Sequence, residues 1–415
     1  MFSRFSYCLA TLTALMVVSP FSVSAQDAKK TDKKKTAYTS IKDAGPDFAL
    51  QGEFTGMIQS ALIADQQIGL RVISLGDGRF SAIEYPGGLP GEGWVGYGEI
   101  ALSGERNGSS VQLAGYPYEI SVNKGFATVY FSNGRSVGEL KQVYRESNSL
   151  GAAAPKCAEV LFDGTDTKKF KNGRMDEEGN LMVGTQLLNS YKNYKLHVEF
   201  RLPYMPYASG QARANSGVYL NSRYEIQILD SYGLEGADNE CGALYRLRKP
   251  DVNMCFPPLS WQSYDIEFRA AKFDEAGNKT NNARICVWHN GVLIHDNVEI
   301  ERKTGGGAQE GPDALPIKFQ NHGNPVAFRN IWILDHDQPP TCYCCCHKRK
   351  CYQVCECGDT GADSTGCGMD GNSGETGSSC GDDCGSDFSR RGYGYYDNHS
   401  VFHDFNKGNY YRRYK

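Results

Sequence analysis

The chain has 415 residues, of which 40% are hydrophobic and 22% are charged, and its formal net charge is −4. This length accommodates two or three domains, each with its own hydrophobic core. The small net charge gives no electrostatic reason to expect nucleic acid or an anionic membrane as a partner. Glycine, tyrosine and phenylalanine are abundant and long helical patterns are scarce, which favours an all-β chain with many turns.

The first 25 residues have the features of a secretion signal. Arg4 supplies a positive charge, an apolar run extends from Cys8 to Val18, and small residues precede Gln26. The run is too short to span a bilayer, although an uncleaved membrane anchor is the alternative. We therefore predict an exported protein that is periplasmic, at the cell surface or extracellular, with no transmembrane segment once the signal is removed. Residues 26–46 are rich in lysine and are predicted to be a solvated linker.

Residues 47–147 are predicted to form a small all-β domain. Strand-like runs flank Gly76-Asp77-Gly78, and others flank Asn123-Lys124-Gly125, which is the pattern of two β-hairpins. No catalytic constellation is visible in this segment, so a structural or docking role is predicted, with a second sugar-binding surface as the alternative. Residues 148–156 are small and are predicted to be a flexible linker.

Residues 157–337 contain many short strand-like runs separated by turn signals. "YKLHVEFRL" alternates apolar and polar residues, and "ARICVWHNGVLIHDNVEI" has a hairpin signal at Asn290-Gly291. Short strands without intervening helices predict an antiparallel β-sandwich.

The stretch 213–233 contains the most informative polar residues. Strand alternation places Glu225 and Gln227 on one face and the isoleucines between and after them on the other, which is the core face. Asp230 would fall on the apolar face of a regular strand, but a β-bulge near Leu229 would return it to the polar face. A row of polar residues on one face is also typical of simple exposure to solvent.

Further polar and aromatic residues support a carbohydrate site. Aromatic rings stack on sugars, and guanidinium and amide groups bind hydroxyls. Each residue has a plainer alternative: Trp261 as a core residue, His322 as a loop residue and Arg213 as an ion-pair partner. The predicted substrate-binding residues are Arg213, Asn215, Gln227, Tyr245, Trp261 and Gln320.

The central segment resembles the 3-keto-disaccharide hydrolase domain family. The resemblance covers about 180 of the 415 residues and rests on several motifs in order. It implies a concanavalin A-like jelly-roll sandwich that follows the small β-domain. The motifs are "LFDGTD" (161–166), "NSGVYLNSRYEIQILDSYG" (215–233), "CGALYRLRKPDVN" (241–253), "WQSYDIEFRAAKFD" (261–274), "HNGVLIHDN" (289–297) and "LPIKFQNHGNPVAFRNIWIL" (315–334).

The segment is also similar to laminarinase-type glucanases, whose strand motif is Glu-x-Asp-x-x-Glu. The corresponding residues are Glu225, Gln227 and Asp230, and this changed set argues against ordinary double displacement by two carboxylates. The family resemblance implies cleavage of 3-keto-glycosides, in which a C3 ketone acidifies the C2 proton. Removal of that proton, elimination at C1 and hydration require a base and an electrophile near O3.

We therefore predict three catalytic residues: Glu225, Asp230 and His322. Glu225 or Asp230 is the predicted base, and Arg213 or His322 is predicted to stabilise the enolate oxygen. A divalent metal ion is an alternative electrophile, and its candidate ligands are the same three catalytic residues. The alternatives to an enzyme are a lectin-like carbohydrate-binding protein and a structural protein of the cell envelope.

The cysteines fall into two groups. Cys241 and Cys255 flank a short loop, and a disulfide between them would stabilise the chain by about 3 kcal/mol in the chain-entropy model. Residues 338–415 form a tail rich in cysteine, glycine and tyrosine with little core material. We expect the tail to be disordered unless cysteine bonding or a metal organises it, and contact with the cell envelope is its predicted role.

Overall fold

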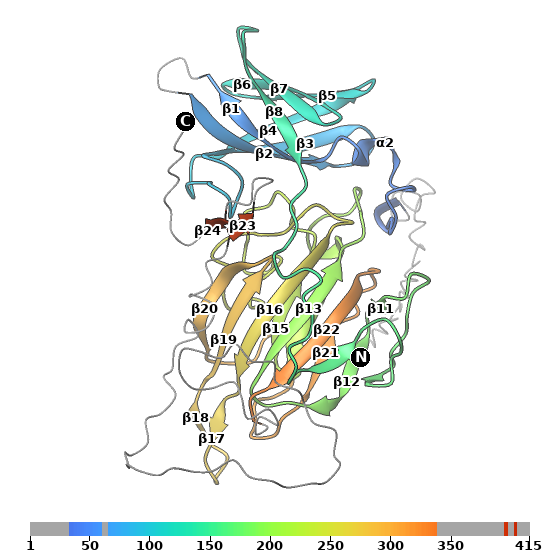
Figure 1. Cartoon of the computed structure of the whole chain (residues 1–415), viewed down its shortest axis with the longest axis vertical. Coiled ribbons are helices and arrows are strands. Elements are labelled where there is room, and N and C mark those ends of the chain that lie inside the picture. Colours follow the sequence, from blue (N-terminus) through green and yellow to red (C-terminus); the bar gives the residue numbers. More distant parts are fainter. Residues whose placement is uncertain (1–32, 60–64, 338–393, 397–401, 405–415) are drawn as a thin grey trace, which may run out of the picture.

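The structure is a computed structural model that describes residues 33–59, 65–337, 394–396 and 402–404. The described residues form a β-barrel and a β-sandwich, which lie one above the other in Figure 1. Helical segments are short, as in α2 (Gly45–Phe48) and the 3-10 turn η1 (Gly210–Ala212). The all-β prediction is confirmed. Among these residues, none lies in a helix that could cross a membrane.

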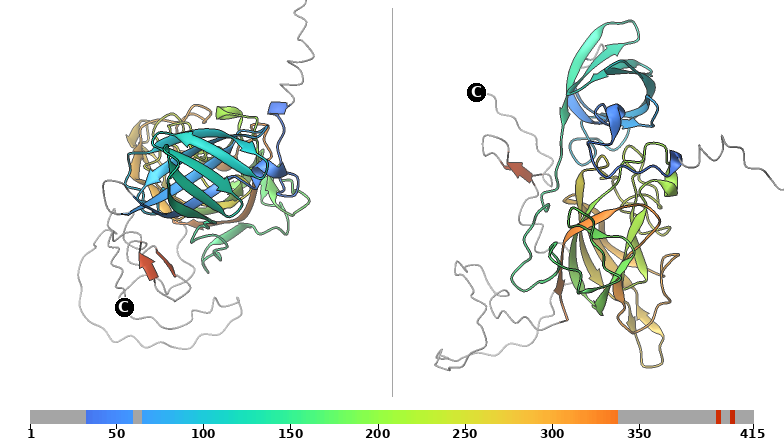
Figure 2. Two further views of the ribbon diagram at one scale, coloured as in Figure 1. Left: turned by 90° about the horizontal axis from the view of Figure 1, so that it is seen from above. Right: turned by 90° about the vertical axis from the view of Figure 1, so that its right-hand side faces the viewer.

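The barrel is an antiparallel meander in which each strand pairs with the next and β1 pairs with β8. Alternate side chains, among them Phe54, Leu70 and Phe80, fill its interior. Figure 2 (left) looks down on this domain. The eight strands are β1 (Gly52–Ile58), β2 (Gln66–Ser74), β3 (Arg79–Pro86), β4 (Ile100–Asn107), β5 (Ser110–Gly115), β6 (Tyr118–Asn123), β7 (Phe126–Phe131) and β8 (Ser136–Val143).

The predicted hairpin turns are confirmed. Residues 76–78 connect β2 to β3 and residues 123–125 connect β6 to β7. In the first turn all three residues have positive φ, and Asp77 at +56° is flanked by glycines that adopt this conformation without strain.

Two antiparallel sheets form the sandwich. The five-stranded sheet has the order β10-β12-β21-β14-β15, and the seven-stranded sheet has the order β11-β22-β13-β16-β19-β20, with β9 also paired to β22. Two small hairpins, β17–β18 and β23–β24, lie outside these sheets. The strands are β9 (Glu159–Phe162), β10 (Phe170–Lys171), β11 (Leu181–Met182), β12 (Thr185–Ser190), β13 (Tyr194–Arg201), β14 (Ser216–Leu220), β15 (Tyr224–Ile228), β16 (Trp261–Arg269), β17 (Lys272–Phe273), β18 (Lys279–Asn281), β19 (Ala283–His289), β20 (Val292–Ile300), β21 (Pro316–Phe319), β22 (Ala327–Asp335), β23 (Gly394–Tyr396) and β24 (Phe402–Asp404).

The sandwich core lies between the two sheets. Val218 and Ile226 of the five-stranded sheet and Val198 of the seven-stranded sheet belong to one buried apolar cluster. Phe319 and Phe328 meet across the gap with ring centroids 4.9 Å apart. Because side chains alternate along a strand, the residues between these core positions face away from the core.

The segment predicted to be a flexible linker is instead bonded to the outer face of the seven-stranded sheet. Ser149 Oγ donates to Asp265 Oδ2 at 2.6 Å, and Asn330 Nδ2 donates to the carbonyl of Ala152 at 3.1 Å. Figure 2 (right) shows the chain descending from the barrel along the sandwich. The small residues of this segment allow its backbone to approach the sheet closely. A composition that usually indicates a flexible linker therefore allows this segment to pack on the sandwich.

The predictions for the chain ends lie outside the described residues. They concern the secretion signal at residues 1–25, residues 26–32 of the predicted linker, and the tail at 338–415 apart from strands β23 and β24. The described part of that linker, residues 33–46, contacts the sandwich, where the Tyr38 amide donates to the Tyr204 carbonyl at 2.9 Å.

Candidate functional site

The candidate site lies on the outer face of the five-stranded sheet, on β21, β14 and β15. The strand register places Tyr219 opposite both Glu225 of β15 and Lys318 of β21. Each of these three residues alternates with core residues of its own strand, so all three face away from the core. The site therefore contains a carboxyl, a phenol and an ammonium group on adjacent strands.

Glu225 is held by contacts on two sides. The Tyr219 hydroxyl donates to Glu225 Oε2 at 2.7 Å, and the Lys318 ammonium lies 4.2 Å from the centroid of the Tyr219 ring. A Cβ atom on Gly217 would collide with Glu225 Oε1, so the carboxyl group occupies the space that the glycine leaves. Only 2% of Glu225 is exposed.

Burial governs the ionisation of Glu225. Removal from water raises its pKa to about 7, against smaller opposing effects of the Tyr219 hydroxyl and the Lys318 ammonium. A carboxyl group with this pKa exchanges a proton readily at neutral pH, which is the property required of a general acid or base.

Amide groups surround Glu225 along the same face. Asn215 Nδ2 donates to the Gln211 carbonyl at 2.8 Å, and Gln227 Nε2 donates to Gln211 Oε1 at 3.0 Å. Gln320 Nε2 donates to the Tyr219 hydroxyl at 3.3 Å. Within the described residues, the buried acceptors Asn215 Oδ1 and Gln320 Oε1 have no hydrogen-bond partner. Such acceptors suit the hydroxyl groups of a sugar.

Two segments cover the site. Residues 241–245 lie along β15, where the Tyr245 amide donates to the Glu225 carbonyl at 3.0 Å. At the same edge of β15, Thr304 Oγ1 accepts from the Glu225 amide at 3.0 Å, and a Cβ atom on Gly306 would collide with the Tyr219 hydroxyl. Tyr245 thus lies beside Glu225, its predicted contact with substrate stays a prediction, and the two segments flank the buried carboxyl.

Asp230 lies beyond the regular part of β15. The β14–β15 pairing ends at Ser216–Ile228, before the position of the predicted bulge, and beyond it the Ser231 amide donates to the Leu229 carbonyl at 2.9 Å. Asp230 forms a buried ion pair of 2.7 Å with Arg213, and burial raises its pKa despite that partner. The predicted roles of Asp230 as a base and Arg213 as an electrophile stay predictions, and the structure shows that the two side chains pair with each other.

The predicted disulfide is not present. Cys241 and Cys255 are free, fully buried thiols. The Cys241 sulfur lies 3.2 Å from the Tyr264 hydroxyl, and the Cys255 sulfur lies 3.6 Å from the carbonyl of Leu229. The two thiols are hydrogen-bonded to each other, so the loop closes as the spacing predicts, with two thiols in place of the disulfide.

Two further predicted residues lie apart from Glu225. His322 is exposed in the loop between β21 and β22 and forms no hydrogen bond or ion pair with Glu225 or Asp230 in the structure. Trp261 belongs to the seven-stranded sheet, where Arg329 and Arg201 lie 4.0 and 5.1 Å from its ring. It therefore lies on a different sheet from Glu225, and its predicted contact with substrate stays a prediction. Across the described residues, no three His, Cys, Asp or Glu side chains are grouped to hold a metal ion, so the predicted ligand set does not form.

The sequence analysis missed Tyr219, Lys318 and Gly217. The first two occupy polar-face positions by the same alternation that placed Glu225, so strand parity applied to the neighbouring strands would have found them. The close contact between Gly217 and the Glu225 carboxyl depends on how the two strands pair, so no local sequence pattern indicates it.

The outer face of the seven-stranded sheet carries a second buried polar cluster. His197 Nδ1 lies 2.8 Å from Asp265 Oδ1, and its Nε2 lies 3.5 Å from Glu199 Oε1. Burial alone would lower the pKa of His197, but these two carboxylates outweigh that effect and raise it to about 9. This cluster lies beneath the segment 147–152 and is remote from Glu225 in the sheet order.

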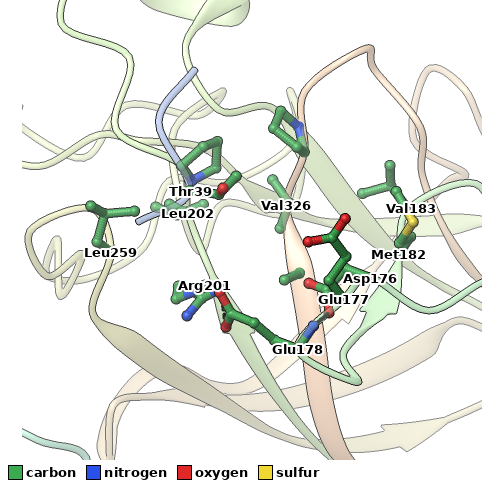
Figure 3. A pocket seen from close by; sticks show the side chains of 13 residues that line it. Thr39, Asp176, Glu177, Glu178, Met182, Val183, Arg201, Leu202, Leu259 and Val326 are labelled. Atoms are coloured by element: carbon green, nitrogen blue, oxygen red, sulfur yellow. Dashed lines mark hydrogen bonds and ion pairs between the residues drawn. The ribbon is translucent and has the colours of Figure 1, made fainter. Parts of the chain in front are cut away.

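A cavity of about 310 Å³ lies at one end of the sandwich (Figure 3). Its wall includes Arg201, which forms a 2.8 Å ion pair with Glu178, and the apolar side chains of Leu259 and Val326. None of the residues predicted for the carbohydrate site lines this cavity.

Comparisons with known proteins found a matching family profile and similar solved structures. Two solved structures from Parabacteroides distasonis, each described as a "putative glycosyl hydrolase", are similar to this chain. The first is 29% identical, covers 44% of this chain and 85% of its own, and has a TM-score of 0.40. The second is 18% identical, covers 44% and 95%, and has a TM-score of 0.33. No curated protein matches. The family profile of the 3-keto-alpha-glucoside-1,2-lyase-like domain matches residues 157–334, which confirms the resemblance of this segment to that family.

Proposed function

We propose that this chain is an exported enzyme that cleaves the glycosidic bond of 3-keto-glycosides, with Glu225 as the base. The observation that best supports this proposal is the buried Glu225 carboxyl, whose pKa is about 7. It lies beside Tyr219 and Lys318, on a face that also has hydrogen-bond acceptors suited to sugar hydroxyls. The family of residues 157–334 supports the substrate class.

The reaction begins with proton removal from C2 of the keto-sugar. The Glu225 carboxylate accepts this proton, and the C–H electron pair forms an enolate whose negative charge lies on O3. The C3 carbonyl then re-forms, a C1–C2 double bond forms, and the bond from C1 to the leaving oxygen breaks. The leaving oxygen takes a proton, and water finally adds hydroxyl to C1 and hydrogen to C2.

The neighbours of Glu225 have separate roles in this proposal. The Tyr219 hydroxyl orients the carboxyl through Oε2, which leaves Oε1 as the proton acceptor. Lys318 is the cation that faces Glu225 and stabilises negative charge on O3. Asn215 and Gln320 accept hydrogen bonds from sugar hydroxyls. Because Glu225 is almost fully buried, substrate entry requires movement of one of the two covering segments.

The test is incubation of the purified chain with a panel of 3-keto-disaccharides and the matching unoxidised disaccharides, with and without chelator. We expect sugar release from the keto substrates alone, and a loss of about 10²–10⁴-fold in kcat for Glu225→Gln, the range for removal of a general base. Binding of the keto-sugars without turnover would replace the proposal with the lectin-like alternative. Export is tested by whether the N-terminus of the mature protein begins at Gln26.

A pair of glycine variants separates placement of the carboxyl group from general damage to the fold. In Gly217→Ala the new methyl group displaces Glu225 Oε1, so kcat should fall about tenfold or more while the chain stays folded. In Gly305→Ala a Cβ atom meets nothing within 4 Å, so kcat should be unchanged. Equal activity of the two variants would contradict the assigned position of Glu225.

A further inference from the structure

The barrel faces the sandwich with buried charged residues. Arg71 of β2 is fully buried, and its Nε donates to Glu53 Oε1 of β1 at 2.9 Å. Arg145, which follows β8, donates to the same carboxylate, with its Nε 2.7 Å from Glu53 Oε2. Charges that are removed from water need partners in the folded state. This set of residues therefore depends on continued contact between the two domains.

Two residues of β2 reach into the sandwich. Arg71 Nη1 donates to the backbone carbonyl of Asn253 at 3.3 Å, and its guanidinium carbon lies 5.4 Å from the Tyr232 ring centroid. Ile73 belongs to the sandwich core, and a Cβ atom on Gly233 would collide with it. Tyr232 and Gly233 lie at the start of the segment 231–256, and Asn253 lies near its end, so β2 contacts both ends of this segment.

The contacted segment is the one that covers the candidate site. The Asn253 side chain donates to the carbonyls of Ser231 and Leu234, each at 2.8 Å, and so holds the two ends of the segment together. Between these ends, residues 241–245 bond to the backbone of β15 beside Glu225. A continuous set of contacts therefore runs from Arg71 to the cover over Glu225.

We propose that the barrel is a clamp on segment 231–256 and that Arg71 is a positioning residue for the cover over Glu225. This inference deepens the proposed function and rests on it for its effect on catalysis. The clamp keeps water away from Glu225. When it is loosened, the segment opens more often and Glu225 behaves more like an ordinary surface carboxyl.

The test compares full-length Arg71→Met with full-length Arg135→Met. Arg135 is an exposed barrel residue remote from the sandwich contacts. We expect amide hydrogen exchange over 231–256 to be about tenfold faster in Arg71→Met than in Arg135→Met, while exchange over β5–β6 and β19–β20 stays equal. We also expect the acid limb of the kcat/KM pH profile to move about one unit lower in Arg71→Met only. Equal exchange over 231–256 in the two folded variants would overturn the clamp.

Arg71→Met leaves Glu53 paired with Arg145, so no buried carboxylate loses its last cation. A second variant at the same position, Arg71→Leu, controls for an effect of the new side chain, and the same local acceleration is expected. Faster exchange throughout the sandwich, β19–β20 included, would mean that Arg71 only stabilises the fold, and the proposal would be wrong. If the unmodified chain cleaves no keto-glycoside, the proposed function fails, but the exchange comparison still decides whether the clamp exists.

Discussion

At the scale of single residues, Glu225 combines a functional property with an unfavourable one. Its carboxyl is almost fully buried, and burial raises its pKa from 4.5 to about 7. The ionised form is therefore disfavoured in the folded protein. A group of this kind lowers stability at the pH where its chemistry is useful, which is a recurrent feature of catalytic residues.

The Glu225→Gln variant should consequently be more stable than the unmodified chain at alkaline pH. The folded-state pKa lies above the unfolded one, so the stability linked to protonation of Glu225 is present below pH 4.5 and lost as the pH rises through about 7. The full shift corresponds to at most about 3 kcal/mol in the free energy of unfolding. Denaturant unfolding at pH 8 and pH 4.5 measures the difference, which should be large at the higher pH and near zero at the lower. A difference that is the same at both pH values would argue against a buried, proton-binding Glu225.

At the scale of elements, the segment 147–152 and β13 depend on each other. Ser149 bonds to Asp265, Asp265 and Glu199 bond to His197, and the His197 ring stacks on Trp332 at 5.0 Å. The segment excludes water from the imidazole, and the two carboxylates keep the imidazole charged. Loss of that charge would leave Asp265 and Glu199 buried with less compensation.

Stability should therefore fall in the alkaline range because of His197. Its folded-state pKa of about 9 exceeds the unfolded value of 6.5, so its contribution is complete below pH 6.5 and is lost as the pH rises through about 9. The shift corresponds to roughly 3 kcal/mol. Denaturant unfolding at pH 6 and pH 9.5 should show the full decrease in the unmodified chain and in His322→Gln, which changes an exposed histidine. In His197→Gln the decrease should be smaller by the His197 contribution. The same decrease in all three proteins would assign it to other groups.

At the scale of the whole molecule, the two domains form one unit in which the barrel contacts the segment that covers the site. The sequence predicts the hairpins of the barrel because turn residues and alternation are local. It does not predict closure by β1–β8 pairing or the docking of Arg71, because both join residues that are far apart in the chain. An arginine on the outer face of a strand is usually exposed to solvent. Arg71 is buried because the second domain packs against it.

The same distinction applies to the site. Glu225 and Gln227 were predicted from strand parity, and Tyr245 from the motif that follows. Asp230 lies beyond the regular ladder of β15, so strand alternation alone does not place its side chain. His197 was overlooked because "YKLHVEFRL" alternates as a half-exposed strand would, and the covering segment comes from a region whose composition suggested a flexible linker.

Proton removal from C2 by Glu225 can be measured without waiting for the glycosidic bond to break. A 3-keto-disaccharide is incubated with the enzyme in deuterated water, and deuterium at C2 of the released keto-sugar and of the remaining substrate is measured by mass spectrometry and NMR. The account predicts one solvent deuterium at C2 of every released keto-sugar, and no release or exchange above background with Glu225→Gln. Release of a keto-sugar that retains its original hydrogen at C2 would contradict it.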